Sequence, residues 1–308
     1  MNKNAKKLII GAAACLVLGG AVISCKKDKA PVVTPPDPIG GFNNSNEVGG
    51  TNLKAHWTFD GTTNERISSL APSSASANTF ATAGLKGQAL SLDSGYLLYP
   101  TIPALNVATL GSVTVSAWIK TQNNGRGPTT VFGLTTGTAT QADWNNGPVL
   151  MFLENGYGVP YNDTLVLKGN FATYQAGLPI RGDNINDFGV RGTDFKTVLG
   201  ANKWVHYVFR YDGVGSNIDL FADGILVSNN LFRHRETAPG VGTGPLVTPI
   251  PTQVIIGGFP NSETGFSLSA AQPWQRKFAG QIDEVRFYTA SLSDADISAL
   301  YQLEKAGR

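Results

Sequence analysis

The stretch FAGQIDEVRFY, residues 278–288, predicts the central element of the fold. Within it, Val285 and Phe287 alternate with Glu284, Arg286 and Tyr288, which is the two-residue repeat of a β-strand. Alternate side chains of a strand point to opposite faces, so the apolar set would lie in a core. We therefore expect a late, central strand here.

A short helix is expected directly after this strand. Ser293 is a favourable N-cap residue, and acidic residues follow it in the first turn. Ile297, Leu300 and Tyr301 then recur at helical spacing. The pattern predicts a short amphipathic helix that closes the fold.

The chain from Thr51 onward has an all-β character. It is rich in Gly, Thr and Asn, and its short apolar runs are separated by turn residues. We expect one domain, a two-sheet antiparallel β-sandwich with jelly-roll topology and a short C-terminal helix. The expected strands include Leu53–Phe59, Ala89–Leu92, Tyr96–Tyr99, Val113–Ile119, Val131–Leu134, Val149–Leu153, Val205–Tyr211, Ile218–Phe221, Ile225–Val227 and Val254–Ile256.

Four blocks of the sequence carry a family resemblance. They are Ala55–Gly61 (AHWTFDG), Val113–Lys120 (VTVSAWIK), Trp204–Gly213 (WVHYVFRYDG) and Gly280–Tyr301, with its Ile-Asp-Glu-Val-Arg core. Together they resemble, in the right order, the laminin-G-like domains of the concanavalin A-like lectin/glucanase superfamily. The resemblance spans roughly residues 51–305. It implies the fold much more strongly than any activity, because such folds host many functions.

The N-terminus has the features of an export signal. Lys3, Lys6 and Lys7 precede the apolar run Leu8–Ile23, and Cys25 follows small residues. This resembles a bacterial lipoprotein signal, so we expect a signal peptide at residues 1–24 and lipidation of Cys25. The run is short and Gly/Ala-rich for a permanent span, although a plain membrane anchor is the alternative.

Residues 25–50 are expected to form a flexible linker, and residues 51–308 the laminin-G-like domain. The linker contains a proline-rich part, Pro31–Pro38, and the glycine pairs Gly40-Gly41 and Gly49-Gly50. Cys25 is followed directly by Lys26 and Lys27 and not by Asp, so resemblance to Gram-negative lipoproteins implies the outer membrane. A tether of this kind suggests a domain that faces the cell exterior.

Cysteine and charge usage exclude several classes of function. Cys15 and Cys25 are the two cysteines, and neither would be left to form a disulfide or a catalytic thiol in the mature domain. The chain has 24 basic and 22 acidic residues, and three of the lysines lie in the predicted signal. A nearly neutral domain argues against a nucleic-acid partner.

Strand parity nominates one set of ligand-binding residues. If Val113 and Val205 face the core, Trp118, His206 and Arg210 point away from it. An indole ring can stack on the apolar face of a sugar while polar groups bind its hydroxyls. The alternative is that these side chains are buried under loops as structural residues.

Two long loops supply a second set of candidates. Residues 135–202 and 229–251 exceed the connections of a minimal sandwich, and long loops in compact domains are often functional. Four aromatic residues in loops are the stronger ligand-binding candidates. They are Trp144, Tyr157, Tyr161 and Trp274.

Glycoside hydrolysis has little support. Related sandwich hydrolases carry Glu-x-Asp-x-x-Glu on one strand, and no such run is present. Asp283 and Glu284 are adjacent, so a regular strand would send them to opposite faces. Acids from separate elements could still converge, and the candidates are Asp143, Glu154, Asp163 and Asp183.

A structural calcium ion is the one cofactor that the resemblance suggests. Many relatives hold calcium with carboxylates and carbonyl oxygens, which suit a hard cation. By position, Asp60 and Asp283 would be its ligands. The alternative is that Asp60 caps a turn and Asp283 bonds to the backbone.

Two classes of function remain open at this point. The first is a lipid-anchored carbohydrate-binding protein that captures a polysaccharide or oligosaccharide for partner enzymes or transporters. The second is a structural or adhesive module that binds protein, and a glycoside hydrolase is a distant third. We expect no enzymatic activity and no catalytic residues. Sequence alone does not name the glycan or the partner.

Overall fold

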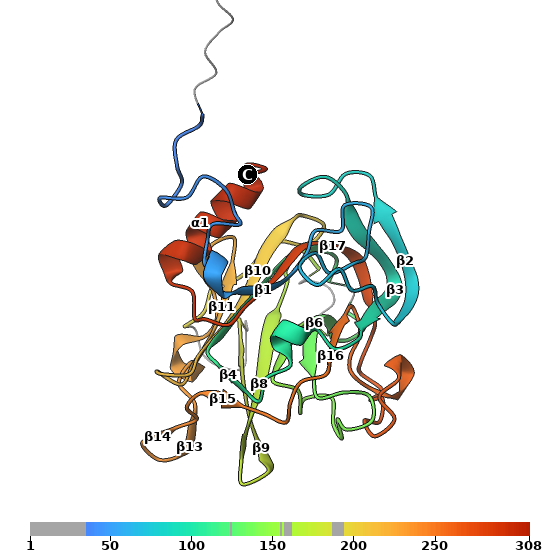
Figure 1. Ribbon diagram of the computed structural model, residues 1–308, viewed down its shortest axis with the longest axis vertical. Helices are drawn as coiled ribbons and strands as arrows, with labels where there is room; N and C mark the ends of the chain where they lie inside the picture. The colour runs from blue at the N-terminus through green and yellow to red at the C-terminus, as the bar shows by residue number, and fades with distance from the viewer. Residues whose placement is uncertain (1–34, 124, 155, 157–161, 187–193) are drawn as a thin grey trace, which may run out of the picture. The chain divides into compact units, whose positions relative to one another are not determined.

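The computed structural model describes residues 35–123, 125–154, 156, 162–186 and 194–308 (Figure 1). The chain divides into two compact units, Met1–Pro36 and Asp37–Arg308, and the elements below belong to the second. Cys25, Tyr157 and Tyr161 lie outside the described residues. Within those residues, no helix is long and apolar enough to cross a membrane.

The unit Asp37–Arg308 consists mostly of β-strands. The described residues contain one α-helix, α1 (Asp294–Lys305), and the short 3-10 helices η1 (Gly50–Asn52), η2 (Pro103–Leu105), η3 (Asn230–Phe232) and η4 (Ser262–Thr264). The strands are β1 (Leu53–Trp57), β2 (Ser74–Ala81), β3 (Ala89–Tyr99), β4 (Thr109–Gly111), β5 (Val113–Thr121), β6 (Thr129–Thr135), β7 (Val149–Leu153), β8 (Leu167–Gln175), β9 (Leu178–Ile185), β10 (Val205–Asp212), β11 (Asn217–Ala222), β12 (Ile225–Leu226), β13 (Glu236–Ala238), β14 (Val241–Gly242), β15 (Leu246–Val247), β16 (Gln253–Ile256) and β17 (Phe278–Tyr288).

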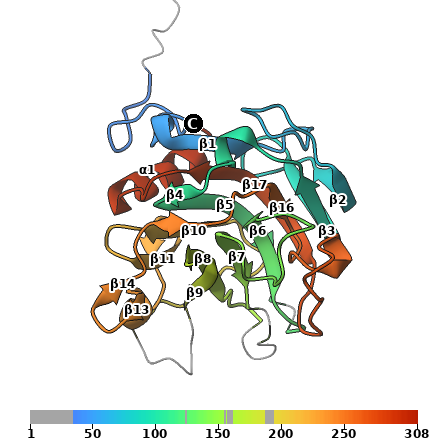
Figure 2. The same cartoon turned by 60° about the horizontal axis from the view of Figure 1, so that its bottom comes forward.

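Most strands belong to one large antiparallel sheet that curls over on itself. Its order is β12-β11-β10-β5-β17-β3-β16-β6-β7-β8-β9, and β1 and β2 pair with β17 and β3 at its side. The curl places β10, β5 and β17 in one layer and β6, β7 and β8 in the other (Figure 2). β11 lies against β8 and β9, which brings the two ends of the sheet together. The predicted jelly-roll sandwich with a C-terminal helix is confirmed, and β17 is central, as expected.

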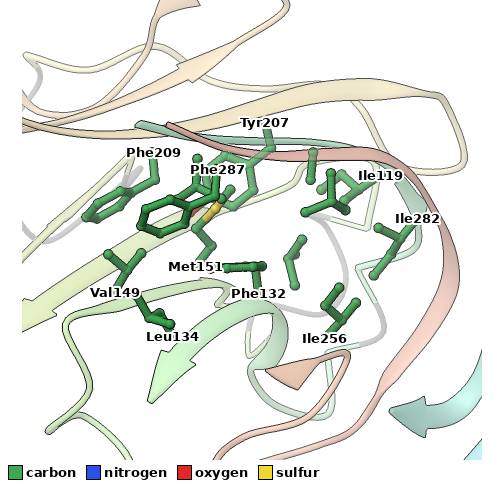
Figure 3. Close-up of a cluster of buried hydrophobic side chains, with 14 of the residues drawn as sticks. Ile119, Phe132, Leu134, Val149, Met151, Tyr207, Phe209, Ile256, Ile282 and Phe287 are labelled. Carbon is green, nitrogen blue, oxygen red and sulfur yellow. The ribbon is translucent and has the colours of Figure 1, made fainter. Parts of the chain in front are cut away.

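The main core lies between the two layers. Its side chains come from the alternate positions that strand parity selects on β5, β10 and β17, so these predicted core faces are confirmed. Figure 3 shows them facing side chains of the opposite layer. Ile119, Tyr207, Phe209, Ile282 and Phe287 meet Phe132, Leu134, Val149, Met151 and Ile256.

A β-bulge interrupts β17 and resets its parity. Asp283 pairs with Trp118 and Arg286 with Ser116, so β17 has one residue more than β5 between these two pairs. Glu284 at the bulge has φ 46°, a left-handed conformation that is uncommon outside glycine. Because of the extra residue, Ile282 and Val285 both face the core although they are three positions apart.

Helix α1 covers the outer face of the β10–β5–β17 layer. Ser293 accepts a hydrogen bond from the Asp296 backbone and Asp296 returns one, which completes a capping box at the predicted N-cap. The apolar side of the helix packs on Val208, Phe221 and Tyr288 of the sheet. Burying a large aliphatic side chain contributes roughly 1.5–3 kcal/mol, so this contact anchors the helix firmly.

The N-terminal boundary of the domain lies earlier than the sequence indicates. Val48 is fully buried, and Ile39 and Phe42 pack on the same cluster as the helix. Gly40 and Gly41 have φ of 60° and 88° and form the turn that brings Ile39 and Phe42 into a bridge. The expectation of a flexible linker up to residue 50 is therefore wrong, and residues 37–50 belong to the domain.

Candidate functional site

The outward-facing set on β5 and β10 is covered by helix α1. Trp118 is 2% exposed, its Nε1 donates to Glu304 Oε2 at 2.7 Å, and its ring stacks on Tyr301 with centroids 5.5 Å apart. His206 is fully buried, with its ring 5.1 Å from that of Trp118. The structure therefore favours the alternative considered from the sequence, that these are buried structural residues, although a helix covers them where loops were expected.

Arg210, the third member of that set, is also engaged internally. Its guanidinium bonds Asp219 at 2.7 Å and Asp294 at 2.6 Å, and it donates to the Leu292 carbonyl at 2.9 Å. These contacts tie β10 and β11 to the first turn of α1. Arg210 is 8% exposed, so its place in the fold is structural.

Replacing His206 by Phe is expected to remove part of the protein's sensitivity to acid. Burial, together with the charge of Arg286, lowers the pKa of His206 to about 3 from 6.5. The unfolded chain therefore binds more protons between these values, and the free energy of unfolding falls as the pH falls through this window. Relative to His206→Phe, the wild-type should lose about 1.4 kcal/mol per pH unit there. Urea unfolding across the window measures this, and parallel profiles would contradict it.

Asp60 and Asp283 hold one loop of the domain. Oδ2 of Asp283 accepts hydrogen bonds from the backbone N–H groups of Leu85 and Lys86 at 2.9 and 3.1 Å, and Oδ1 accepts from Glu284 N at 2.9 Å. Asp60 Oδ1 accepts from Gln88 N at 2.9 Å. Both carboxylates thus fasten the segment between β2 and β3.

These residues do not fit a calcium ion. Burial raises the pKa of Asp283 to about 8, although its backbone hydrogen bonds oppose the shift. Its oxygens already face three N–H donors, whereas calcium requires a shell of six to eight oxygen ligands. In the described part of the chain, no group of three or more His, Cys, Asp or Glu side chains could hold a metal ion.

Two of the loop tryptophans come together on the outer side of the other layer. The rings of Trp144, between β6 and β7, and Trp274, before β17, meet edge to face with centroids 5.1 Å apart. Phe152 on β7 and Phe259 also touch Trp144, at 6.0 and 5.7 Å. We call these four residues the tryptophan cluster. Trp274 is 36% exposed, so the cluster reaches the surface.

A line of charged side chains continues from this cluster across β8 and β9. The ammonium of Lys168 lies 5.6 Å from the centroid of the Phe152 ring. The same ammonium contacts Glu154 at 2.9 Å and Asp183 at 3.4 Å, and Asp183 contacts Arg235 at 3.3 Å. We call Glu154, Lys168, Asp183 and Arg235 the charged strip. Phe152 joins it to the tryptophan cluster.

Polar groups border the charged strip on the same strands. Arg181 on β9 bonds the Asn146 side chain through Nε at 2.8 Å and through Nη2, and it lies 3.9 Å from Asp143. Asn170 on β8 is 8% exposed, and its Oδ1 has no hydrogen-bond partner among the described residues. A buried acceptor without a partner is costly, and this one is covered by protein and not open to solvent.

Comparison with known proteins identifies the family. The model of the concanavalin A-like lectin/glucanases superfamily matches residues 94–298. The chain belongs to this superfamily. No curated protein sequence matches it.

Several solved structures share the superfamily fold at low identity. Domain 4 of an extracellular arabinanase from Geobacillus stearothermophilus, in complex with arabinotriose, matches with TM-score 0.49 and 17% identity over 82% of this chain and 98% of that domain. The binding domain of botulinum neurotoxin DC, in complex with SialylT, gives 0.50 and 12%, over 83% of this chain and 52% of that one. Trypanosoma rangeli sialidase gives 0.45 and 12%, over 82% and 32%. These likenesses concern the fold alone.

The superfamily sandwich therefore brings together only part of the expected site. Trp144 and Trp274 meet, whereas Trp118, His206 and Arg210 lie beneath α1 on the opposite layer. Of the four acids considered for convergence, Glu154 and Asp183 meet on Lys168 and Asp143 lies at the border. Asp163 instead accepts a hydrogen bond from Thr164 at 3.1 Å.

Sequence reasoning named Glu154 and Asp183 of the charged strip but missed Lys168, which joins them. Lys168, Asn170 and Tyr174 occupy alternate positions of β8, opposite the core residues Leu167 and Phe171. This two-residue repeat marks a strand with one polar face and could have been found. Phe152 and Phe259 carried no signal of their own, because isolated phenylalanines are as common in cores as in binding sites.

Proposed function

We propose that this protein binds carbohydrate at the tryptophan cluster, with the charged strip as the polar part of the same site. The observation that carries the proposal is the exposed Trp274 ring, held edge-on by Trp144 and Phe259 at 5.1 and 5.4 Å. Such rings cannot turn freely, so the exposed indole face is preorganised. Preorganisation of this kind favours stacking on a rigid ligand.

The chemistry around the rings suits a sugar. An indole offers an apolar surface to the C–H face of a pyranose, and nearby polar groups can bind hydroxyls. The charged strip supplies carboxylate acceptors on Glu154 and Asp183 and cationic donors on Lys168 and Arg235. Lys168 and Asp183 lie on β8 and β9 and Glu154 directly follows β7, so the sheet fixes the spacing of these three groups.

Binding without hydrolysis is the form of the proposal. Glu154 and Asp183 both pair with the Lys168 ammonium, whereas a hydrolase needs one carboxylic acid and one carboxylate placed on either side of the bond that it cleaves. We therefore assign the two acids to ligand hydroxyls and to the architecture of the strip.

We further propose that the domain is carried to the outer membrane by lipid on Cys25 and faces the exterior. Support comes from the sequence, in the basic start, the apolar run and the cysteine that resemble a lipoprotein signal. A surface-held lectin of this kind would capture a polysaccharide or oligosaccharide for partner enzymes or transporters. The alternative function is an adhesive module that binds protein.

The variant Trp274→Ala is expected to weaken glycan binding about tenfold, the effect of losing roughly 1.4 kcal/mol of stacking. The measurement is calorimetry of residues 37–308 against plant, algal and host polysaccharides, with chromatography for products. Trp204→Ala is the matched control, because Trp204 is a partly exposed tryptophan elsewhere and lines a separate hollow. Equal loss in both variants would refute the site at Trp274. If the folded wild-type binds no polysaccharide, a protein ligand is favoured.

A further inference from the structure

A long polar groove lies beside the tryptophan cluster. One hollow of about 730 Å³ and another of about 380 Å³ share the lining residues Asp93, Gln122 and Ala279, so they form one continuous groove. Its walls come from β3, β17 and the segment that follows β5. The volumes are of the size that encloses small ligands elsewhere. We call it the basic groove, because basic side chains line it.

Cations outnumber acids around the basic groove. Lys120, Arg126, Arg276 and Lys277 line it, against the two acids Asp93 and Glu263. Glu263 and Lys277 are 3.8 Å apart and form only a loose pair. With four cations against two acids, the lining of the groove has an excess of positive charge, which attracts anions.

Arg276 is fixed in position but keeps binding capacity. Its Nη1 donates to the carbonyls of Pro273 and Gln275 at 2.6 and 2.7 Å, which orients the guanidinium. The guanidinium makes no other hydrogen bond among the described residues, so its Nε and Nη2 remain open to a ligand. A guanidinium held in this way matches the two oxygens of a carboxylate or sulfate.

Two buried amides in the wall of the groove lack a partner on one atom each. Oε1 of Gln275 accepts from Asn261 Nδ2 at 2.6 Å and from Gln272 N at 3.0 Å, which fixes the amide orientation. Its Nε2 is buried and has no acceptor among the described residues, and Gln281 Oε1 likewise has no donor. A buried polar atom without a partner costs about 1–3 kcal/mol. Both atoms have almost no exposed surface, so a ligand would reach them only if the wall of the groove moved.

We propose that the basic groove binds an acidic sugar unit, one that carries a carboxylate or sulfate, of the glycan that stacks on Trp274. The proposal rests on the carbohydrate-binding function proposed above and names the class of ligand. One residue, Gln275, separates Trp274 from Arg276 in the chain, so their Cα atoms are at most roughly 7 Å apart. Neighbouring units of one glycan chain can therefore reach both the indole and the guanidinium.

The test compares acidic and neutral oligosaccharides on the unit Asp37–Arg308, which contains all of the described core clusters. The probes are oligogalacturonate for the carboxylate, carrageenan oligosaccharides for the sulfate, and arabinan and galactan oligosaccharides as neutral glycans. Calorimetry is run at low and high salt. We expect tighter binding of one acidic class, weakened by salt because the contacts are ionic.

The decisive variant is Arg276→Ala/Lys277→Ala. It should raise the dissociation constant for the acidic probe about tenfold, the loss of one charge-assisted hydrogen bond, and leave neutral glycans unaffected. The matched control, Lys54→Ala/Arg66→Ala, removes one partly buried lysine and one exposed arginine away from the groove. It should change neither.

The two proposals fail in different ways. If neutral glycans bind as well as acidic ones and depend on Trp274 alone, or if the double variant binds the acidic probe like the wild-type, the basic groove is not a subsite while the lectin function stands. If no glycan of any class binds the folded protein, the carbohydrate-binding function itself is overturned. Preference for carrageenan or for oligogalacturonate identifies sulfate or carboxylate as the recognised group.

Discussion

A protein that begins at Thr51 is expected to be less stable than one that begins at Asp37 by about 4.5–9 kcal/mol in free energy of unfolding. The shorter protein lacks Val48, which is fully buried. It also lacks Ser45 and Asn46, whose Oγ and Oδ1 atoms lie 3.1 and 2.8 Å from the Arg286 guanidinium. Hydrogen bonds to a charged group contribute about 1.5–3 kcal/mol each, and a buried valine contributes a similar amount. Most of the stability of a typical domain would be at risk.

Urea unfolding of the two versions gives the measurement. Asn46→Ala in the longer version should account for one of the hydrogen bonds, whereas Asn43→Ala on the same segment should have little effect, because the Asn43 side chain is exposed and only its backbone is used. If both versions unfold at the same urea concentration, residues 37–50 are a linker after all.

Replacing Arg286 by Ala is expected to cost about 3–5 kcal/mol, the typical penalty for breaking a buried ion pair. Arg286 is fully buried and lies between two carboxylates, Glu284 at 2.8 Å and Glu304 at 2.6 Å. Burial alone would raise the pKa of Glu284, but the hydrogen bond from His56 and the charge of Arg286 lower it to about 2. Without Arg286, the buried Glu284 carboxylate on β17 would lose one of its two partners and keep His56 alone.

The comparison that isolates this effect is Arg66→Ala, which removes an exposed arginine from the same domain. Surface charges away from a network usually change stability by less than about 0.5 kcal/mol. Both variants are measured by urea unfolding at neutral pH. A loss below about 1 kcal/mol for Arg286→Ala would show that water or a rearrangement replaces its contacts.

The elements of the fold were largely predictable because they obey local rules. The two-residue repeat on β5, β10 and β17 indicated the core faces, and Ser293 with Asp296 indicated where α1 begins. The bulge at Glu284 was missed, although the three-residue spacing of Ile282 and Val285 breaks the two-residue repeat, because the position of the extra residue is set by pairing with β5. For the same reason the segment Asp37–Gly50 looked like a linker. Its few apolar residues are meaningful only beside α1.

The candidate site shows the same limit. Trp144 and Trp274 could be nominated as single aromatic residues in loops, but their contact joins positions far apart in the chain. Parity placed Trp118 and His206 on the outward face correctly, and yet the face is covered. Whether an outward tryptophan meets solvent or a helix is decided by tertiary packing, which a strand pattern does not contain.

The segment before β1 and the end of the chain meet beside helix α1. Arg308 donates to the carbonyls of Asp37 and Asn43 at 2.9 and 3.0 Å, whereas the tryptophan cluster belongs to the layer that contains β7. Under the proposed lipid attachment, the domain is held through the N-terminal side of Asp37. Many copies held on one surface could then engage a single long polymer together. Weak binding at each copy would add up to strong retention, because each further contact takes place at a high effective concentration.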